Sequence, residues 1–292
     1  MFEDFGVDRI ATSGAEINFR RGGSGPPVLL LHGYPQTHVL WHELAPRLAE
    51  ELTVVAADMR GYGDSSKPPD GDNHAGYSKR ALAQDQVELM AALGFESFAV
   101  VGHDRGARVA HRLALDHPDR VTRVAMLDIV PTRKMFESFG KELATANYHW
   151  FFLIQAPDLP ERMIGADPDY YLDQKLERWS APGFEFAPEA VAEYRRCFRA
   201  PGAVHATCED YRAGASIDLE HDEADIDSRV TCPLLVLWGE QGRIAKLFDV
   251  LETWRERASD VRGRAVSGGH FPAEEAPRET LAELLPFLRG WR

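Results

Sequence analysis

One segment of the chain, Val100-Val101-Gly102-His103-Asp104-Arg105-Gly106, carries residue types and a spacing that could do chemistry. An apolar run precedes it and a helical pattern follows. The Gly-x-Asp-x-Gly spacing is typical of a sharp strand-to-helix turn that exposes a nucleophile, a position that serine occupies in esterases. The alternative is that Asp104 is an ordinary helix cap. The flanking strand and helix patterns favour the nucleophile.

An aspartate at this position dictates which reaction the turn could support. Its reference pKa of about 3.9 leaves it ionised at neutral pH, so it needs no base to attack. Displacement at an sp3 carbon would give an ester, which water can hydrolyse, whereas serine would leave a stable ether. Asp104 therefore indicates substitution at sp3 carbon, as in dehalogenation or epoxide opening.

Hydrolysis of such an ester needs a base and a site for the oxyanion. His270 lies in the loop Ser267-Gly268-Gly269-His270, after the last apolar run and before the last helical pattern. This late position is the usual place of the base in chains with such a turn. The oxyanion hole should come from the backbone N–H groups of Arg105 and Tyr34.

Two carboxylates compete for the role of the acid that orients His270. Asp128 ends the apolar run Val121–Leu127, where a buried carboxylate needs a hydrogen-bond partner such as an imidazole N–H. Glu240 lies in the other common location, the loop after Leu234–Leu237, but Gly242 occupies the usual aspartate position there. We favour Asp128 over Glu240.

The elements that must position these residues are continuous apolar runs that alternate with helical patterns. Such runs indicate strands covered on both faces. They are Val28–Leu31, Thr53–Ala57, Phe98–Val101, Val121–Leu127, Leu234–Leu237 and Val261–Val266. The helical patterns are Leu40–Glu50, Ser78–Leu93, Ala107–Asp116, Ala245–Ala258 and Pro277–Leu288. The alternation predicts an α/β fold with a mostly parallel, doubly wound sheet, preceded by a hairpin over Asp8–Thr12 and Ala15–Arg21.

The alternation stops between Pro131 and Ala215, where the pattern is helical. This stretch holds 14 of the 29 aromatic residues in under a third of the length. We expect residues 131–215 to form a helical cap, or lid, over an enclosed apolar site, inserted into a core of residues 1–130 and 216–292. The alternative is that these aromatics only form the insertion's own small core.

Composition narrows the class of partner. The 292 residues carry 33 Lys and Arg against 46 Asp and Glu, a net charge of −13 that argues against binding nucleic acid or anionic membranes. No apolar run approaches the ~20 residues of a membrane span, and the first residues do not read as a signal peptide. Three cysteines without a CxxC pair suggest a reducing compartment, so we expect a cytoplasmic protein. We expect neither metal nor cofactor.

Several stretches of the chain resemble fluoroacetate dehalogenases of the α/β-hydrolase superfamily. They are HGYPQTHVLW, DMRGYGDSSKP, GHDRGARVAHRLALDHP and NYHWFFLIQ. The resemblance covers essentially the whole chain. It implies an α/β-hydrolase fold, an acid at Asp128, and hydrolysis of haloacetates to glycolate and halide through an ester on Asp104. It also implies a homodimer.

The resemblance further implies how the substrate is held. Arg105 and Arg108 correspond to two arginines that bind the substrate carboxylate, which suits paired guanidinium groups. His149, Trp150 and Tyr211 correspond to three residues that hold the leaving halide. Arg105 directly after the nucleophile favours an anionic substrate, since haloalkane dehalogenases usually have tryptophan there.

Two other functions remain open from the sequence. One is an epoxide hydrolase or another hydrolase with an Asp nucleophile, a class that usually uses two lid tyrosines to protonate the epoxide oxygen. The candidates are Tyr148, Tyr170, Tyr171, Tyr194 and Tyr211. The other is a ligand-binding protein that has kept the scaffold without catalysis, which the intact Asp104, His270 and Asp128 disfavour.

Overall fold

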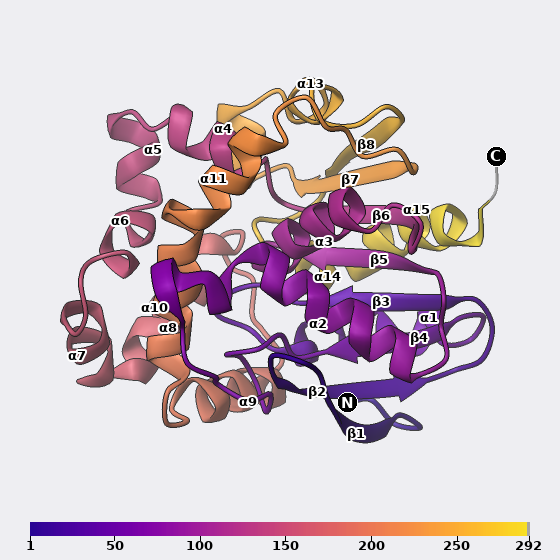
Figure 1. Ribbon diagram of the computed structural model, residues 1–292, viewed down its shortest axis with the longest axis horizontal. Coiled ribbons are helices and arrows are strands. Elements are labelled where there is room, and N and C mark those ends of the chain that lie inside the picture. Colours follow the sequence, from indigo (N-terminus) through magenta and orange to yellow (C-terminus); the bar gives the residue numbers. More distant parts are fainter. Residues whose placement is uncertain (291–292) are drawn as a thin grey trace.

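The fold is built on one eight-stranded sheet in the order β1-β2-β4-β3-β5-β6-β7-β8. A computed structural model describes residues 1–290 (Figure 1). The strands are β1 (Gly6–Ala11), β2 (Glu16–Gly22), β3 (Pro27–Leu31), β4 (Thr53–Ala57), β5 (Phe98–His103), β6 (Val121–Leu127), β7 (Leu234–Gly239) and β8 (Val261–Val266). β3 to β8 are parallel, and β1 and β2 form the antiparallel hairpin at one edge. The predicted α/β sheet is confirmed.

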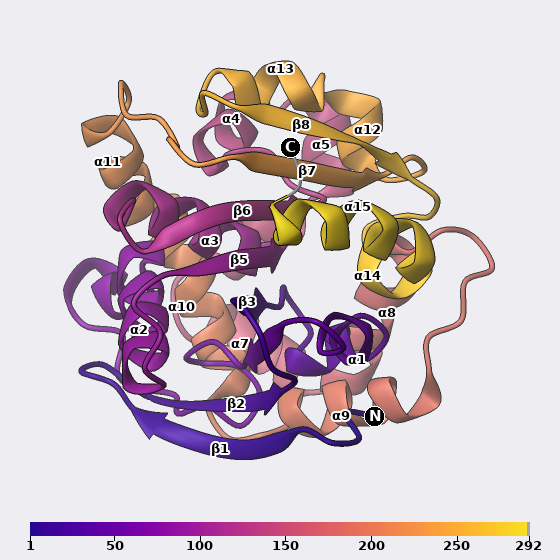
Figure 2. The ribbon, with the colours of Figure 1, turned by 90° about the vertical axis from the view of Figure 1, so that its right-hand side faces the viewer.

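Both faces of the parallel strands are buried because their side chains alternate between two separate apolar clusters. On β3, Leu29 and Leu31 pack in the cluster that includes helices α2 (Lys79–Ala92) and α3 (Arg105–Asp116). Val28 and Leu30 point to the other face, toward α1 (Ala45–Leu48) and α15 (Pro277–Arg289). Figure 2 shows these two helical layers on opposite sides of the sheet. This double cover explains why the strands read as continuous apolar runs.

Two predicted helices are each divided in the structure. The helix predicted over Leu40–Glu50 is a 3₁₀ turn, η1 (His38–Trp41), followed by the short α1. Pro46 lies in the first turn of α1, where a proline is well tolerated. The helix predicted over Ala245–Ala258 is α12 (Arg243–Leu247) and α13 (Val250–Arg255). Phe248 between them is extended, and Asp249 caps α13 by accepting a hydrogen bond from the Glu252 N–H.

A helical segment, defined here as residues 132–224, separates β6 from β7. Its helices are α4 (Thr132–Glu137), α5 (Lys141–Ala146), α6 (His149–Leu153), α7 (Leu159–Gly165), α8 (Pro168–Trp179), α9 (Pro188–Phe198), α10 (Ala203–Ala215) and α11 (Ile217–Ala224). Figure 1 shows most of them gathered at the left end of the sheet, with α15 at the opposite end. The chain is completed by η2 (Asp72–Tyr77) and α14 (Pro272–Glu275). Within residues 1–290, no helix combines the length and the apolar character needed to cross a bilayer.

The close packing of α3 against β3 leads to a prediction about Gly106. A Cβ atom there would lie 2.3 Å from the carbonyl oxygen of His32 and 2.4 Å from that of Leu31. Because both contacts are backbone atoms, Gly106→Ala should lower the free energy of unfolding by about 1–3 kcal/mol, the usual cost of overpacking. Urea unfolding measures the change. Gly165→Ala is the matched control, since no atom lies within 4 Å of its added Cβ. Equal effects of the two substitutions would contradict the packing argument.

Candidate active site

Asp104 occupies the turn between β5 and α3 with an unusual backbone conformation. Its φ of 46° and ψ of −114° lie outside the regions that side chains other than glycine normally adopt. The backbone N–H of Tyr34 donates to Oδ1 of Asp104 at 2.9 Å. Arg105 begins α3, so its N–H lacks a partner inside the helix. The predicted oxyanion donors therefore flank the aspartate, and one of them already contacts its carboxylate.

His270 stands between the two aspartates that the sequence singled out. Its Nε2 lies 3.8 Å from Oδ2 of Asp104, and its Nδ1 donates to Oδ2 of Asp128 at 2.6 Å. The second oxygen of Asp128 accepts a hydrogen bond from the Gly239 N–H at 3.1 Å. Glu240 is exposed and does not line the cavity beside His270. Of the two candidate acids, the structure thus brings Asp128, and not Glu240, into contact with His270.

The loop of His270 is held by residues that the sequence did not single out. Glu275 accepts hydrogen bonds from the N–H groups on both sides of the histidine, those of Gly269 and Phe271, each at 2.8 Å. The backbone N–H of His270 donates to the Trp179 carbonyl at 2.8 Å. His103 Nε2 donates to the His270 carbonyl at 2.7 Å. In the sequence, the acidic pair Glu274-Glu275 shortly after His270 is the one feature that could have indicated a role for Glu275.

Burial and charge set the protonation of the site. Burial lowers the pKa of His270, but the hydrogen bond and charge of Asp128 outweigh it and raise that pKa above its usual value. Burial raises the pKa of Asp104, yet the neighbouring His270 and other cationic groups bring it below the usual range. Burial lowers the pKa of His103 to about 3, so this ring is neutral, as a donor to a carbonyl can be. Asp104 is therefore an ionised nucleophile beside a base.

A cavity of about 270 Å³ opens onto the carboxylate of Asp104. Asp128, His270, Arg108, His149 and Trp150 all line it. Burial lowers the pKa of His149 well below its usual value, so the imidazole is neutral and offers one N–H. Nδ1 of His149 is buried without a hydrogen-bond partner among the described residues. The structure thus brings the predicted His-Trp pair to the wall of the same cavity as the nucleophile.

Arg105 was predicted to bind the substrate carboxylate and Tyr211 to hold the halide, and neither residue lines the cavity. The Arg105 guanidinium donates to Asp210 from Nε at 2.7 Å and from Nη2 at 2.9 Å, and Cζ stacks 4.2 Å from the centre of the Tyr211 ring. Asp210 also pairs with Lys79. The reason is electrostatic: a fully buried guanidinium needs a carboxylate, and α10 supplies one. Tyr211 packs edge-on against His149, with ring centres 5.6 Å apart.

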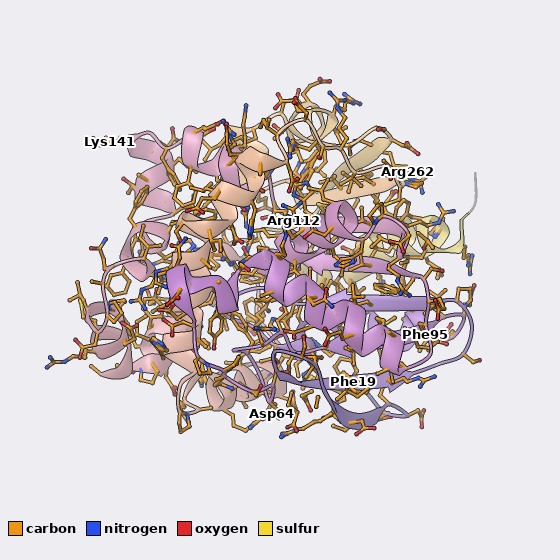
Figure 3. All side chains as sticks on the ribbon, in the orientation of Figure 1. Phe19, Asp64, Phe95, Arg112, Lys141 and Arg262 are labelled. Atoms are coloured by element: carbon orange, nitrogen blue, oxygen red, sulfur yellow. The ribbon has the colours of Figure 1, made fainter. Side chains whose placement is uncertain are left out.

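Arg108 is unlike the other buried arginines. Four of the five buried arginines within residues 1–290 pair with carboxylates: Arg60 with Asp85, Arg105 with Asp210, Arg112 with Asp116 and Asp225, and Arg212 with Glu161 and Glu209. Figure 3 marks Arg112 at the centre of the molecule. Arg108 donates only to the Val130 carbonyl and the Thr132 hydroxyl, at 3.0 and 2.8 Å. Burial lowers its pKa to about 10, which keeps it charged at neutral pH. Its charge faces the cavity without a carboxylate partner among residues 1–290.

One group of residues within 1–290 could present ligands to a metal ion, and it is separate from the cavity. It consists of Asp70, His74 and Glu209. Glu209 is already engaged by His74 at 2.5 Å and by Arg212 at 2.6 Å. None of these residues lines the cavity.

Comparison with known proteins places this geometry in a family. A profile of the α/β hydrolase fold matches residues 26–277. A solved structure from Nostoc sp., described as an α/β hydrolase, superposes with a TM-score of 0.98 at 59% identity, covering 99% of this chain and 100% of that one. A fluoroacetate dehalogenase of Burkholderia sp. is 48% identical over 100% of this chain and 96% of its own length. A soluble epoxide hydrolase of Corynebacterium sp. is 36% identical over 96% of each.

The fold and the nucleophile turn define an α/β hydrolase, and the chain belongs to that superfamily. Within the superfamily it belongs to the family of the fluoroacetate dehalogenases.

The contact between His270 and Asp128 generates a prediction about pH. A base must be neutral to act, so hydrolysis should fail as the pH drops through the pKa of His270. Asp128→Asn removes the charge that raises this pKa, so the acidic limb of the pH–rate profile should move to lower pH. The maximal rate should also fall, because the imidazole loses the carboxylate that orients it. Steady-state rates from pH 5 to 9 measure both effects. Glu240→Gln, which should leave the profile unchanged, is the control. A shift with Glu240→Gln instead would reverse the assignment of the acid.

Proposed function

We propose that this chain is a hydrolytic dehalogenase of haloacetates, which converts a fluoroacetate-like substrate and water to glycolate and halide. The enzyme acts on the carbon–halogen bond. The observation that carries the proposal is the presence, in one cavity, of an ionised nucleophile and a buried arginine without a carboxylate partner. A haloacetate supplies what each of them lacks, a carbon with a leaving group for Asp104 and a carboxylate for Arg108.

Arg108 is the main contact for the substrate carboxylate. Its guanidinium faces the cavity, and a carboxylate there would form charge-assisted hydrogen bonds in a low-dielectric environment. Arg105 contributes its backbone N–H to the oxyanion hole. Its guanidinium is held by Asp210, and only Nη1 has no hydrogen bond to residues 1–290. Arg108 offsets the negative charge that a −13 protein and Asp104 present to an anion, whereas the charge of Arg105 is paired with Asp210.

In the first step, Oδ2 of Asp104 attacks the α-carbon while Oδ1 is held by the Tyr34 N–H. The carbon–halogen bond breaks, and the halide leaves with the bonding electrons. His149 and Trp150 line the cavity where donors can meet the halide, and Tyr211 packs against both rings. Hydrogen bonds to the halide lower the activation barrier if they strengthen as negative charge develops on the halide in the transition state. Fluoride needs this help most, since it is strongly hydrated and leaves carbon poorly.

In the second step, His270 removes a proton from water, which attacks the carbonyl carbon of the Asp104 ester. The N–H groups of Tyr34 and Arg105 stabilise the tetrahedral oxyanion, and Asp128 stabilises the imidazolium. The acyl–oxygen bond breaks, so glycolate leaves and Asp104 is restored as a carboxylate. The distance of 3.8 Å between His270 Nε2 and Asp104 Oδ2 leaves His270 close to the ester it must serve.

The related epoxide hydrolase makes epoxide opening the alternative reaction, and the cavity favours the dehalogenase. Epoxide hydrolases of this type protonate the oxygen with two lid tyrosines, yet no tyrosine within residues 1–290 lines the cavity. Tyr194 donates to Glu274 at 2.9 Å, and Tyr148 accepts from Lys175 at 2.6 Å. Tyr170 is 63% exposed. The hydroxyl group of Tyr194 is therefore occupied and that of Tyr170 faces solvent, and the other candidates, Tyr148, Tyr171 and Tyr211, do not line the cavity either.

The remaining parts of the proposal concern the setting of the enzyme. The helical segment serves as the cap of the site, because it contributes His149, Trp150 and Trp179 to the cavity wall. We propose a cytoplasmic homodimer without a cofactor, with a small anion as its ligand rather than nucleic acid or a membrane. The resemblance to the family supports the dimer, and the net charge of −13 supports the choice of ligand.

The experiment that tests the mechanism uses His270→Ala. Because Asp104 needs no base to attack, this variant should release about one equivalent of halide from bromoacetate or fluoroacetate and then stop. Mass spectrometry should find a carboxymethyl ester on the peptide that contains Asp104. Asp104→Asn, which lacks the nucleophile, should show neither halide release nor adduct. Turnover of halide by His270→Ala without any modification of Asp104 would refute the two-step reaction.

The unpaired charge of Arg108 generates a second prediction. A charge-assisted hydrogen bond contributes roughly 1.5–3 kcal/mol, so Arg108→Leu should lower kcat/KM for bromoacetate about 10- to 100-fold. A neutral substrate such as bromoacetamide should be spared. Steady-state kinetics with both substrates measures the ratio, and Arg120→Leu on the surface is the control. If both substrates lose activity equally, Arg108 has only a structural role.

A further inference from the structure

The cavity has an outer half that the proposed reaction of haloacetate does not use. Its wall comes from the end of α8, from α12 and from the loop that leads into α12. Three cationic side chains stand in this wall: Arg178, Arg243 and Lys246. Arg178 and Lys246 are exposed, and Arg243 is half-buried. They therefore lie between the solvent and the buried residues around Asp104.

Arg243 is the centre of this outer half. Its guanidinium makes only two long hydrogen bonds, from Nη1 to Oδ1 of Asn147 at 3.4 Å and from Nη2 to the Arg178 carbonyl at 3.5 Å. No carboxylate within residues 1–290 pairs with it at 4 Å or less. Burial lowers its pKa, and Asp128 is the main charge that opposes this effect. Arg243 is thus a second guanidinium, besides Arg108, that faces the cavity without a counter-ion.

The part of the cavity wall that holds these cations lacks acidic side chains, although the chain as a whole is acidic. Acidic side chains outnumber basic ones by 46 to 33, and several arginines elsewhere on the surface pair with them, such as Arg133 with Glu137 and Arg195 with Asp173. The only carboxylates that line the cavity are Asp104 and Asp128, both at the inner end. The outer wall therefore presents positive charge alone, which suits an anion.

The size of the cavity leaves room for a longer substrate. A volume of about 270 Å³ corresponds to roughly nine water molecules at their share of liquid volume. A haloacetate has two carbons, and Arg108, His149 and Trp150 hold it at the inner end. The space in front of Arg243 would then contain only water.

We propose that the outer cations, with Arg243 at their centre, bind a second carboxylate of the substrate, so that the enzyme acts on 2-halodicarboxylates such as 2-halosuccinate. This inference rests on the proposed dehalogenase function. Oδ2 of Asp104 bonds to C2 while the carbon–halogen bond breaks and the halide leaves with the electron pair. Water then cleaves the acyl–oxygen bond of the ester. The product is the 2-hydroxydicarboxylate, and His270 passes the released proton to solvent.

The first test compares two substrates that differ only in the second anion. 2-Bromobutyrate has a methyl group where 2-bromosuccinate has a carboxylate. Wild-type kcat/KM should be higher for 2-bromosuccinate, and Arg243→Gln should lower that value about 10- to 100-fold, the loss expected for one charge-assisted contact. Arg243→Gln should leave 2-bromobutyrate and bromoacetate within about twofold. Arg9→Gln, on the exposed edge strand β1, removes the same charge from a distant surface and should change nothing. Equal losses for all three substrates, or no wild-type preference for 2-bromosuccinate, would overturn the proposal.

A binding experiment separates this proposal from the proposed function. Calorimetry with the Asp104→Asn variant measures the affinity for succinate and for butyrate, neither of which can react. Succinate should bind at least tenfold more tightly, and adding Arg243→Gln should abolish the difference. If bromoacetate is hydrolysed but succinate binds no better than butyrate, the outer site is refuted while the dehalogenase stands. If succinate is preferred but no halide is released from bromoacetate, the outer anion site stands and the dehalogenase does not.

Discussion

The structure depends on one electrostatic constraint: an anionic nucleophile must meet an anionic substrate inside a protein of net charge −13. Repulsion between the two carboxylates would exclude the substrate unless fixed positive charge lay between them. Burying a guanidinium without a carboxylate partner destabilises the fold. The structure pairs Arg105 with Asp210, but it leaves Arg108 with only neutral hydrogen-bond partners. The unpaired cation is stabilised when the ligand arrives, which couples affinity to the charge of the ligand.

The parallel sheet makes this arrangement possible by collecting distant residues at one edge. Asp104, Asp128 and Gly239 follow or end three neighbouring strands, β5, β6 and β7, so their backbones lie side by side. The Asp128 N–H donates to the Leu237 carbonyl, and the Asp104 N–H donates to that of Leu127. The two carboxylates are therefore fixed by the hydrogen bonds of the sheet itself, and the chemistry varies through the loops and helices added around them.

Sequence patterns predict most of the core because its rules are local. Continuous apolar runs identified the parallel strands, and the glycines around Asp104 identified the turn. Sequence patterns were less accurate for side-chain partners, because these depend on contacts between segments that are packed together only in the fold. The side chain of Arg105 turns toward Asp210, a residue 105 positions away whose approach depends on how α10 packs. The Glu275 contacts with Gly269 and Phe271 join residues close in sequence, but they depend on the conformation of the His270 loop. No periodicity in the sequence encodes either pairing.

The hydrogen bonds around His270 also join the helical segment to the catalytic base. The His270 N–H donates to the Trp179 carbonyl, and Glu275 accepts from the Ala181 N–H at 2.6 Å as well as from both neighbours of His270. Residues 179–181 and the base are thus parts of one hydrogen-bonded unit. Lifting this part of the helical segment would break the bonds that orient the imidazole. The orientation of the catalytic base therefore depends on how the end of α8 packs, so the helical segment acts on the base as well as on the cavity wall.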